Sequence, residues 1–201
     1  MRSQPVHCRT LGRRQTTQSS GASMATFSED SLLVVFTDFT RFAAQAERLP
    51  DREVADVMDA YYELAGATIS RCGGRIVKFI GDATLAVFPG DSVDQGVLGL
   101  LQLKDAADHL MMDRGWESRL TVKAHFGRVM AGQFGPVSDK RYDILGKTVN
   151  VTARLQASGV ALSVEAFRQL SPEVRKRFKK HTPPVTYIRV EDSHQHAGTR
   201  Q

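Results

Sequence analysis

The sequence predicts one α+β domain in which helices cover one face of a mainly antiparallel sheet. Apolar runs of strand length alternate with two long segments of helical periodicity, in the order β-α-β-β-α-β. The chain has 201 residues, of which 41% are hydrophobic, and this is enough for one domain with an ordinary core.

The first strand and the first long helix come early in the chain. The apolar run SLLVVFTDF (31–39) predicts the strand. In residues 51–72 apolar side chains recur every three or four positions, which predicts a helix. The helix should end at Gly73 and Gly74, because glycine commonly follows a helix C-cap.

A hairpin and a second helix follow. The runs RIVKFI (75–80) and ATLAVF (83–88) are joined by a Gly-Asp pair, which suits a tight turn between two strands. A Pro-Gly-Asp sequence then opens a helix over about 92–113, for which Asp91 is the expected N-cap.

The last third of the chain contributes shorter elements. We expect a strand pair with glycines at the bends, then a strand end, a glycine turn and a helix, then a short strand and helix, and finally a closing strand. The segments are LTVKAHFGRVMAGQFG (120–135), YDILGKTVNVTARLQA (142–157), ALSVEAFRQL (161–170) and VTYIRV (185–190). The sum is a ferredoxin-like sandwich with extra C-terminal strand and helix elements.

The two ends of the chain have a different composition from its middle. Residues 1–27 are rich in Ser, Thr, Gln, Gly and Arg, so we expect a disordered basic tail before a domain at 28–191 and a flexible tail at 192–201. The N-terminal composition is also that of a transit-type peptide, and a start at Met24 is a further alternative.

Charge and composition exclude several functions. Four arginines in residues 1–23 account for most of the net +5, and the basic run RKRFKK (175–180) is expected to be a solvated helix end, so we expect no nucleic-acid partner. No apolar run approaches the ~20 residues of an integral membrane segment. Two cysteines make no disulfide framework, which favours a cytoplasmic protein.

Two acidic residues stand where charge is unexpected. Asp38 ends the first strand and Asp82 lies at the hairpin tip, and these two points are neighbours in such a sheet. Two adjacent carboxylates repel unless a cation separates them, and oxygen ligands suit Mg²⁺ or Mn²⁺. Alternatively, Asp38 caps the next helix and Asp82 only makes the turn.

Four blocks occur in order along the chain: VVFTDFTRF, GGRIVKFIGDATLAVF, HFGRVMAGQFG and YDILGKTVNVTARL. Together they resemble the catalytic domain of class III adenylate and guanylate cyclases, of the bacterial homodimeric type. The resemblance covers about residues 30–190. It implies conversion of ATP to cyclic AMP and pyrophosphate, with two Mg²⁺ or Mn²⁺ ions per active site.

The resemblance also assigns roles to residues. Asp38 and Asp82 match the metal-binding aspartates, Asn150 matches the residue that orients the ribose, and Arg154 matches the arginine that stabilises the transition state. In this family one protomer supplies the aspartates and the other supplies the remaining residues, so a homodimer follows.

Purine recognition is assigned to Lys78 and Asp143. The lysine donates to adenine N1 and the aspartate accepts from the N6 amino group, whereas guanine presents the reverse pattern and guanylate-forming members place Glu and Cys here. A site built to hydrogen-bond one purine leaves polar groups unpaired with the other, which favours ATP.

The triphosphate is expected over the loop formed by Phe39, Thr40, Arg41 and Phe42, where backbone N–H groups at a helix start attract anions. The family usually has glycine before the second Phe, so Arg41 is a departure that adds a phosphate contact or stiffens the loop. Lys179 takes the place of a lysine that reaches the terminal phosphate, with an ordinary solvated lysine as the alternative.

Three alternatives stay open. They are a guanylate cyclase, a catalytically silent cyclase-like module that binds nucleotide, and a diguanylate cyclase, whose acidic hairpin motif after Gly-Gly is lacking at residues 73–79. The sequence does not identify the regulator, and the alternatives are a partner protein, bicarbonate or calcium, and dimerisation itself.

Overall fold

The computed structural model describes residues 27–182 and 184–192, so most of the two predicted tails lies outside the described residues. The strands are β1 (Phe27–Phe39), β2 (Arg75–Ile80), β3 (Ala83–Pro89), β4 (Leu120–Phe134), β5 (Arg141–Leu145), β6 (Val160–Leu162), β7 (Phe178–His181) and β8 (Thr186–Arg189). The helices are α1 (Phe42–Ala46), α2 (Asp51–Arg71), the 3-10 turn η1 (Gly90–Ser92), α3 (Val93–Asp113), α4 (Lys147–Arg154), α5 (Val164–Gln169) and α6 (Pro172–Arg175).

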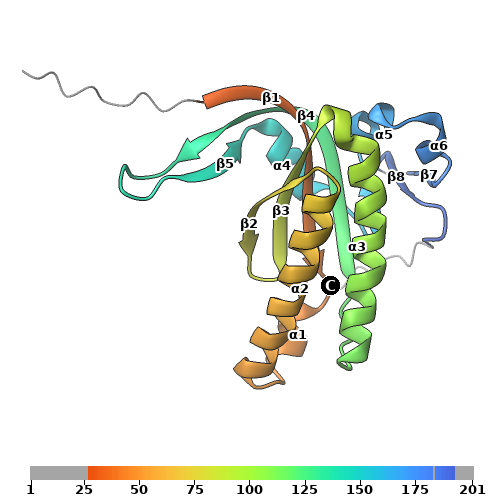
Figure 1. Ribbon diagram of the computed structural model, residues 1–201. Coiled ribbons are helices and arrows are strands. Elements are labelled where there is room, and N and C mark those ends of the chain that lie inside the picture. Colours follow the sequence, from red (N-terminus) through yellow and green to blue (C-terminus); the bar gives the residue numbers. More distant parts are fainter. Residues whose placement is uncertain (1–26, 183, 193–201) are drawn as a thin grey trace, which may run out of the picture.

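All strands join one sheet in the order β2-β3-β1-β4-β6-β8-β7, and β5 pairs with the far half of β4. The pairs are antiparallel except β4 with β6, which run parallel. The predicted α+β fold with a mainly antiparallel sheet is therefore confirmed. Long β1 and β4 form its spine and curve together at one end, where β5 branches off (Figure 1).

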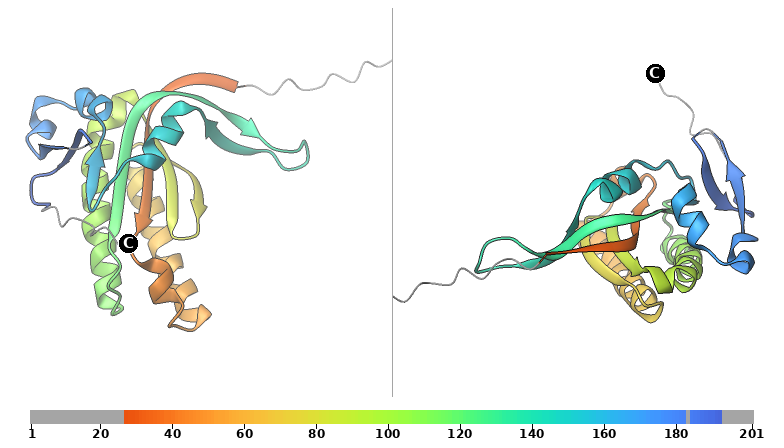
Figure 2. Two further views of the ribbon diagram at one scale, coloured as in Figure 1. Left: turned by 180° about the vertical axis from the view of Figure 1, so that it is seen from behind. Right: turned by 90° about the horizontal axis from the view of Figure 1, so that it is seen from above.

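Helices α2 and α3 lie side by side on one face of the sheet and bury the main core, which includes Leu33, Tyr61, Phe88 and Leu100 (Figures 1 and 2). A second, smaller core lies on the opposite face and is covered in part by α4. The expectation that helices cover only one face is thus wrong for α4, whose partly buried Val149 packs on this second core.

The predicted strand pair at 120–135 is one continuous strand, β4. Its glycines do not divide it into two strands, because β1 pairs with it along the whole length of β1. Gly127 has a packing role instead: a Cβ at this position would lie 2.7 Å from Thr148 Oγ1, so its absence lets α4 approach the sheet.

Two further local predictions need correction. The N-cap of α3 is Ser92, and Asp91 belongs to the preceding 3-10 turn. The basic run at 175–180, for which the sequence predicts a helix end, is the end of α6 followed by edge strand β7.

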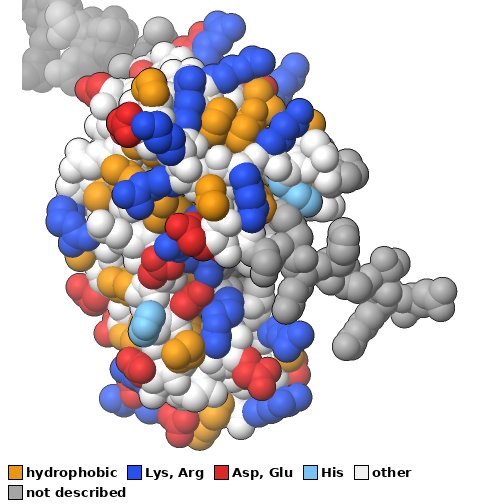
Figure 3. Space-filling view, turned by 90° about the vertical axis from the view of Figure 1, so that its right-hand side faces the viewer, with side chains coloured by type: hydrophobic (Ala, Val, Ile, Leu, Met, Phe, Trp, Pro, Cys, Tyr) orange, Lys and Arg blue, Asp and Glu red, His pale blue; other side chains and the backbone are white. Residues whose placement is uncertain are grey.

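On the side of the molecule that carries α3 and the C-terminal elements, Lys and Arg gather toward the upper part, whereas charges of both signs mix below (Figure 3). Within residues 27–182 and 184–192, no helix combines the length and apolar character needed to cross a membrane.

Candidate active site

The structure brings the two predicted metal-binding aspartates together at one end of the sheet. Asp38 is the next-to-last residue of β1, and Asp82 lies in the turn between β2 and β3. The backbone N–H of Phe39 donates a 3.3 Å hydrogen bond to Asp82 Oδ2. On the other side of the turn, the hydroxyl of Tyr62 on α2 donates to the carbonyl of Gly81 at 2.6 Å. The turn is therefore fixed to both β1 and α2.

The acidic pair is electrostatically strained. Burial, together with the hydrogen bond and repulsion from Asp38, raises the pKa of Asp82 to about 6. A divalent cation between the two carboxyl groups would remove this repulsion, and carboxylate oxygens suit Mg²⁺ or Mn²⁺. Among the described residues, no group of three or more His, Cys, Asp or Glu side chains is arranged to hold a metal ion by itself. The donor set thus fits an ion that takes its other ligands from water and substrate phosphate.

The alternative role of Asp38 as a helix cap is not seen. The N-cap of α1 is Arg41, and no side chain donates or accepts a capping hydrogen bond there.

The side chains of the predicted phosphate loop are already engaged. Phe39 and Phe42 point inward and pack on aromatic rings of the main core. Thr40 Oγ1 accepts a 3.0 Å hydrogen bond from the N–H of Arg119, and Thr40 N–H donates to the carbonyl of the same residue at 2.9 Å. The backbone N–H groups of Phe39 and Thr40 are engaged as well, so a phosphate would meet the backbone at Arg41 and Phe42.

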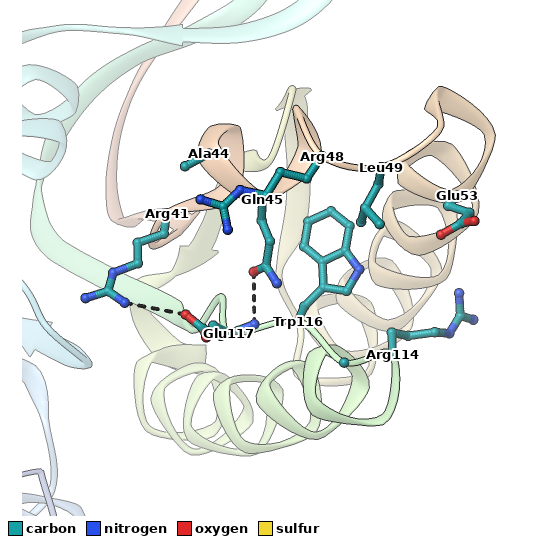
Figure 4. A pocket seen from close by; sticks show the side chains of 10 residues that line it. Arg41, Ala44, Gln45, Arg48, Leu49, Glu53, Arg114, Trp116 and Glu117 are labelled. Atoms are coloured by element: carbon teal, nitrogen blue, oxygen red, sulfur yellow. Dashed lines mark hydrogen bonds and ion pairs between the residues drawn. The ribbon is translucent and has the colours of Figure 1, made fainter.

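Arg41 has a left-handed backbone conformation, with φ of 56°, which glycine adopts freely and other residues rarely do. Its guanidinium points toward Glu117 and lies 3.6 Å from the carboxylate of that residue (Figure 4). It lines a surface hollow of about 380 Å³ that lies behind the phosphate loop (Figure 4). The hollow is lined by both basic and acidic side chains, which are Arg41, Arg48, Arg114, Glu53 and Glu117. It therefore favours neither an anionic nor a cationic ligand.

The predicted purine-reading pair is in direct contact. Lys78 Nζ donates to Asp143 Oδ2 at 2.5 Å, which links edge strand β2 to β5. Asp143 Oδ1 accepts a second hydrogen bond, 2.8 Å long, from the N–H of Ile144. Both side chains keep solvent access, with 43% and 24% of their surfaces exposed.

A β-bulge, which sequence reasoning missed, directs Lys78 to this site. Ile76 pairs with Ala86 and Lys78 pairs with Leu85, so Val77 is an extra residue in β2. Without it Lys78 would pair with Thr84, which contacts Tyr61 beneath the helices. The bulge moves the lysine to the opposite face, that of Leu85 and the second core. The adjacent apolar residues 76–77, which break strand alternation, are the signal that could have revealed it.

Helix α4 presents the two predicted catalytic residues on its exposed face. Its buried face carries Thr148 and Thr152, and the Thr148 hydroxyl donates to the carbonyl of Arg128 at 2.6 Å. Asn150 and Arg154 are also four residues apart, and Arg154 Nε donates to the carbonyl of Asn150 at 3.2 Å. Because side chains four apart share a helix face, both are oriented together.

Lys179 is not brought to the phosphate loop within one chain. It lies on β7, at the opposite edge of the sheet from β2, and its amine donates to the Val190 carbonyl at 2.8 Å.

This geometry agrees with the family to which the sequence can be matched. The family model described as the adenylate and guanylate cyclase catalytic domain matches residues 24–191. The chain belongs to this cyclase family. Among curated relatives, this cyclase domain is 26% identical to adenylate cyclase 2 of Rhizobium meliloti over 84% of the chain and 46% of that protein. It is 25% identical to the adenylate cyclase of Anabaena cylindrica over 62% of the chain and 26% of that protein.

Solved cyclase structures share the fold. The adenylyl cyclase CyaB from P. aeruginosa superposes with a TM-score of 0.72 at 19% identity, covering 86% of this chain and all of that one. The guanylate cyclase domain of RhGC from Catenaria anguillulae, solved in complex with GTP, gives 0.67 at 22% identity, covering 77% and 87%. Members that use either purine thus share this fold. The chain spans less than half the length of the two curated relatives above.

Proposed function

We propose that this domain is an adenylate cyclase, which converts ATP to 3′,5′-cyclic AMP and pyrophosphate. The observation that carries the proposal is the direct contact between Lys78 on β2 and Asp143 on β5. A lysine offers only donors and an aspartate only acceptors, so together they complement adenine N1 and the N6 amino group. Guanine would leave both unpaired, and burying unpaired polar groups is costly.

In the reaction, the ribose 3′-oxygen attacks the α-phosphorus in line, its proton leaves to solvent, and the bond to the pyrophosphate oxygen breaks. Asn150 orients the ribose. Arg154 stabilises the negative charge that develops in the transition state on the oxygens bound to phosphorus and on the bridging oxygen. Asp38 and Asp82 would hold two Mg²⁺ or Mn²⁺ ions, which when bound lower the pKa of the 3′-hydroxyl and neutralise the phosphates.

The phosphates lie over the backbone of residues 39–42, since the side chains of this loop are engaged elsewhere. Lys179 keeps its predicted role as the lysine that contacts the terminal phosphate, and another part of the proposed assembly would bring it there. Its present hydrogen bond to Val190 would have to break for this role.

We propose that the sites form between two copies of the chain, one giving the aspartates and the other the remaining residues. Exposed apolar side chains support this assembly, because they occur on the elements that carry the purine and catalytic residues and on β4, which pairs with β5. They are Phe79 and Ile80 on β2, Met130 on β4, Leu145 on β5 and Val151 on α4. Such surface favours burial against a partner.

The test is incubation of the purified chain with Mn²⁺ and either ATP or GTP, with the product identified by mass spectrometry. Cyclic AMP from ATP is expected, and cyclic GMP as the preferred product would overturn the assignment. In the same assay, Asp38→Ala and Lys78→Ala proteins, each inactive alone, should regain activity when mixed. Absence of rescue on mixing would count against composite sites.

A further inference from the structure

A second side-chain contact joins β2 to β5 beside the purine-reading pair. The guanidinium carbon of Arg75 lies 3.7 Å from the centre of the Tyr142 ring. A cation this close to an aromatic face is held by the ring quadrupole. Tyr142 directly precedes Asp143, and Arg75 stands on the other side of the bulge from Lys78. None of the roles assigned above uses this contact.

The register puts both cations on one face. Arg75 pairs with Val87, and Lys78 pairs with Leu85, and both partners belong to the second core. Directly opposite residues of antiparallel strands share a face. The two cations of β2 therefore project from the same side of the strand. Arg75 contacts Tyr142, and Lys78 contacts the next residue of β5, Asp143.

Strand β2 needs such support. Among the described strands it lies at one edge of the sheet and pairs only with β3, and its bulge falls just before Lys78. Beyond the bulge β2 is held to α2, where Phe79 stacks on Tyr62. Arg75 holds the part of the strand before the bulge, where a slip of one residue would turn the lysine to the helix face. Tyr142 is a firm anchor because it is partly buried and packs against the second core.

We propose that Arg75 and Tyr142 are positioning residues that determine purine specificity. They clamp the bulged strand to β5, so that Lys78 and Asp143 meet the edge of adenine as one preset unit. This inference rests on the proposed adenylate cyclase function. It extends that function, because it places part of the substrate choice in two residues that do not touch the base.

The clamp predicts a specific kinetic change. When it is removed, Lys78 and Asp143 remain but are held loosely, so KM for ATP should rise while kcat falls less. The preference for ATP over GTP should drop about tenfold, since small misplacements of positioning groups are costly. A purely structural role would lower the amount of active protein and reduce both nucleotides' rates alike.

The experiment compares variants of the full chain by ATP turnover and by competition with GTP. Arg75→Gln removes the cation, and Arg71→Gln is the matched control, because Arg71 is an exposed arginine at the end of α2. Tyr142→Leu removes the ring, whereas Tyr142→Phe keeps it. Thermal melting of each protein reports its folding.

The clamp is supported if Arg75→Gln and Tyr142→Leu lose selectivity while Arg71→Gln and Tyr142→Phe keep it. It is overturned if Arg75→Gln folds and binds ATP and GTP in the wild-type ratio. If Arg75→Gln does not fold, Arg75→Lys decides, since it keeps a cation and must retain the preference that Tyr142→Leu loses. Failure of the proposed function is distinct, because then the wild-type chain itself would make no cyclic AMP.

Discussion

The acidic pair and the purine-reading pair differ in how well their charges are satisfied. Asp143 has its carboxylate matched by Lys78 and by a backbone N–H. Asp82 instead lies beside Asp38, and its pKa is raised to about 6. The charges of the first pair are matched without a ligand, whereas the repulsion within the second pair is unrelieved. In the proposed cyclase, specificity is thus built into the free chain, and catalytic competence waits for the metal and the nucleotide.

The largest effect is expected when one carboxylate of the acidic pair is removed. Asp38→Ala should lower kcat about 10³-fold or more, because the metal contribution to stabilising phosphoryl charge is lost. The affinity for Mn²⁺, measured by calorimetry in the presence of a non-hydrolysable ATP analogue, should fall in parallel. The exposed Asp56→Ala on α2 serves as control, and equal activity of the two variants would remove the acidic pair from the mechanism.

The second largest effect is expected when both residues of the purine-reading pair are replaced. The double variant Lys78→Glu/Asp143→Cys reverses the donor and acceptor pattern, so the ratio of kcat/KM for ATP to that for GTP should shift toward GTP by about 10²-fold. Competition assays with both nucleotides measure it. Lys180→Glu, which changes an exposed lysine on β7, should leave the ratio unchanged. A double variant that still prefers ATP would show that the purine is read elsewhere.

A smaller effect concerns stability without metal. The pKa of Asp82 is raised in the folded state, so its contribution favours folding at low pH and is lost as pH rises from about 4 through about 6. Asp82→Asn should therefore raise the melting temperature of the metal-free protein at pH 7.5 by roughly 2–4 °C, after discounting for partial solvent exposure. The difference should vanish near pH 4. Melting curves across this range measure it, and a stabilisation that is independent of pH would contradict the strained pair.

The smallest effect concerns the phosphate loop next to the acidic pair. Arg41→Gly and Arg41→Ala both remove the exposed ion pair to Glu117, but only glycine adopts the left-handed conformation freely. The glycine variant should be more stable than the alanine variant by ~1 kcal/mol. Urea unfolding of the two proteins measures the difference. Equal stability would mean that the loop relaxes when Arg41 is replaced.

Much of the fold followed from local patterns. The helical period of residues 51–72, the glycines after it and the Gly-Asp turn at the hairpin each depend on neighbours in the sequence, and α2 and the β2–β3 hairpin formed as expected. The positions of Asp38 and Asp82 at the end of one strand and the tip of a hairpin followed for the same reason.

What only the tertiary structure decided is the face on which side chains meet. The bulge at Val77 turns Lys78 toward Asp143, and the bare backbone of Gly127 in unbroken β4 lets α4 pack on the second face. Both outcomes depend on strands or helices distant in the sequence. The pattern of residues sets which elements form, because that is governed by nearby contacts. The register between elements is governed by packing over the whole domain, so only the folded chain fixes which groups meet.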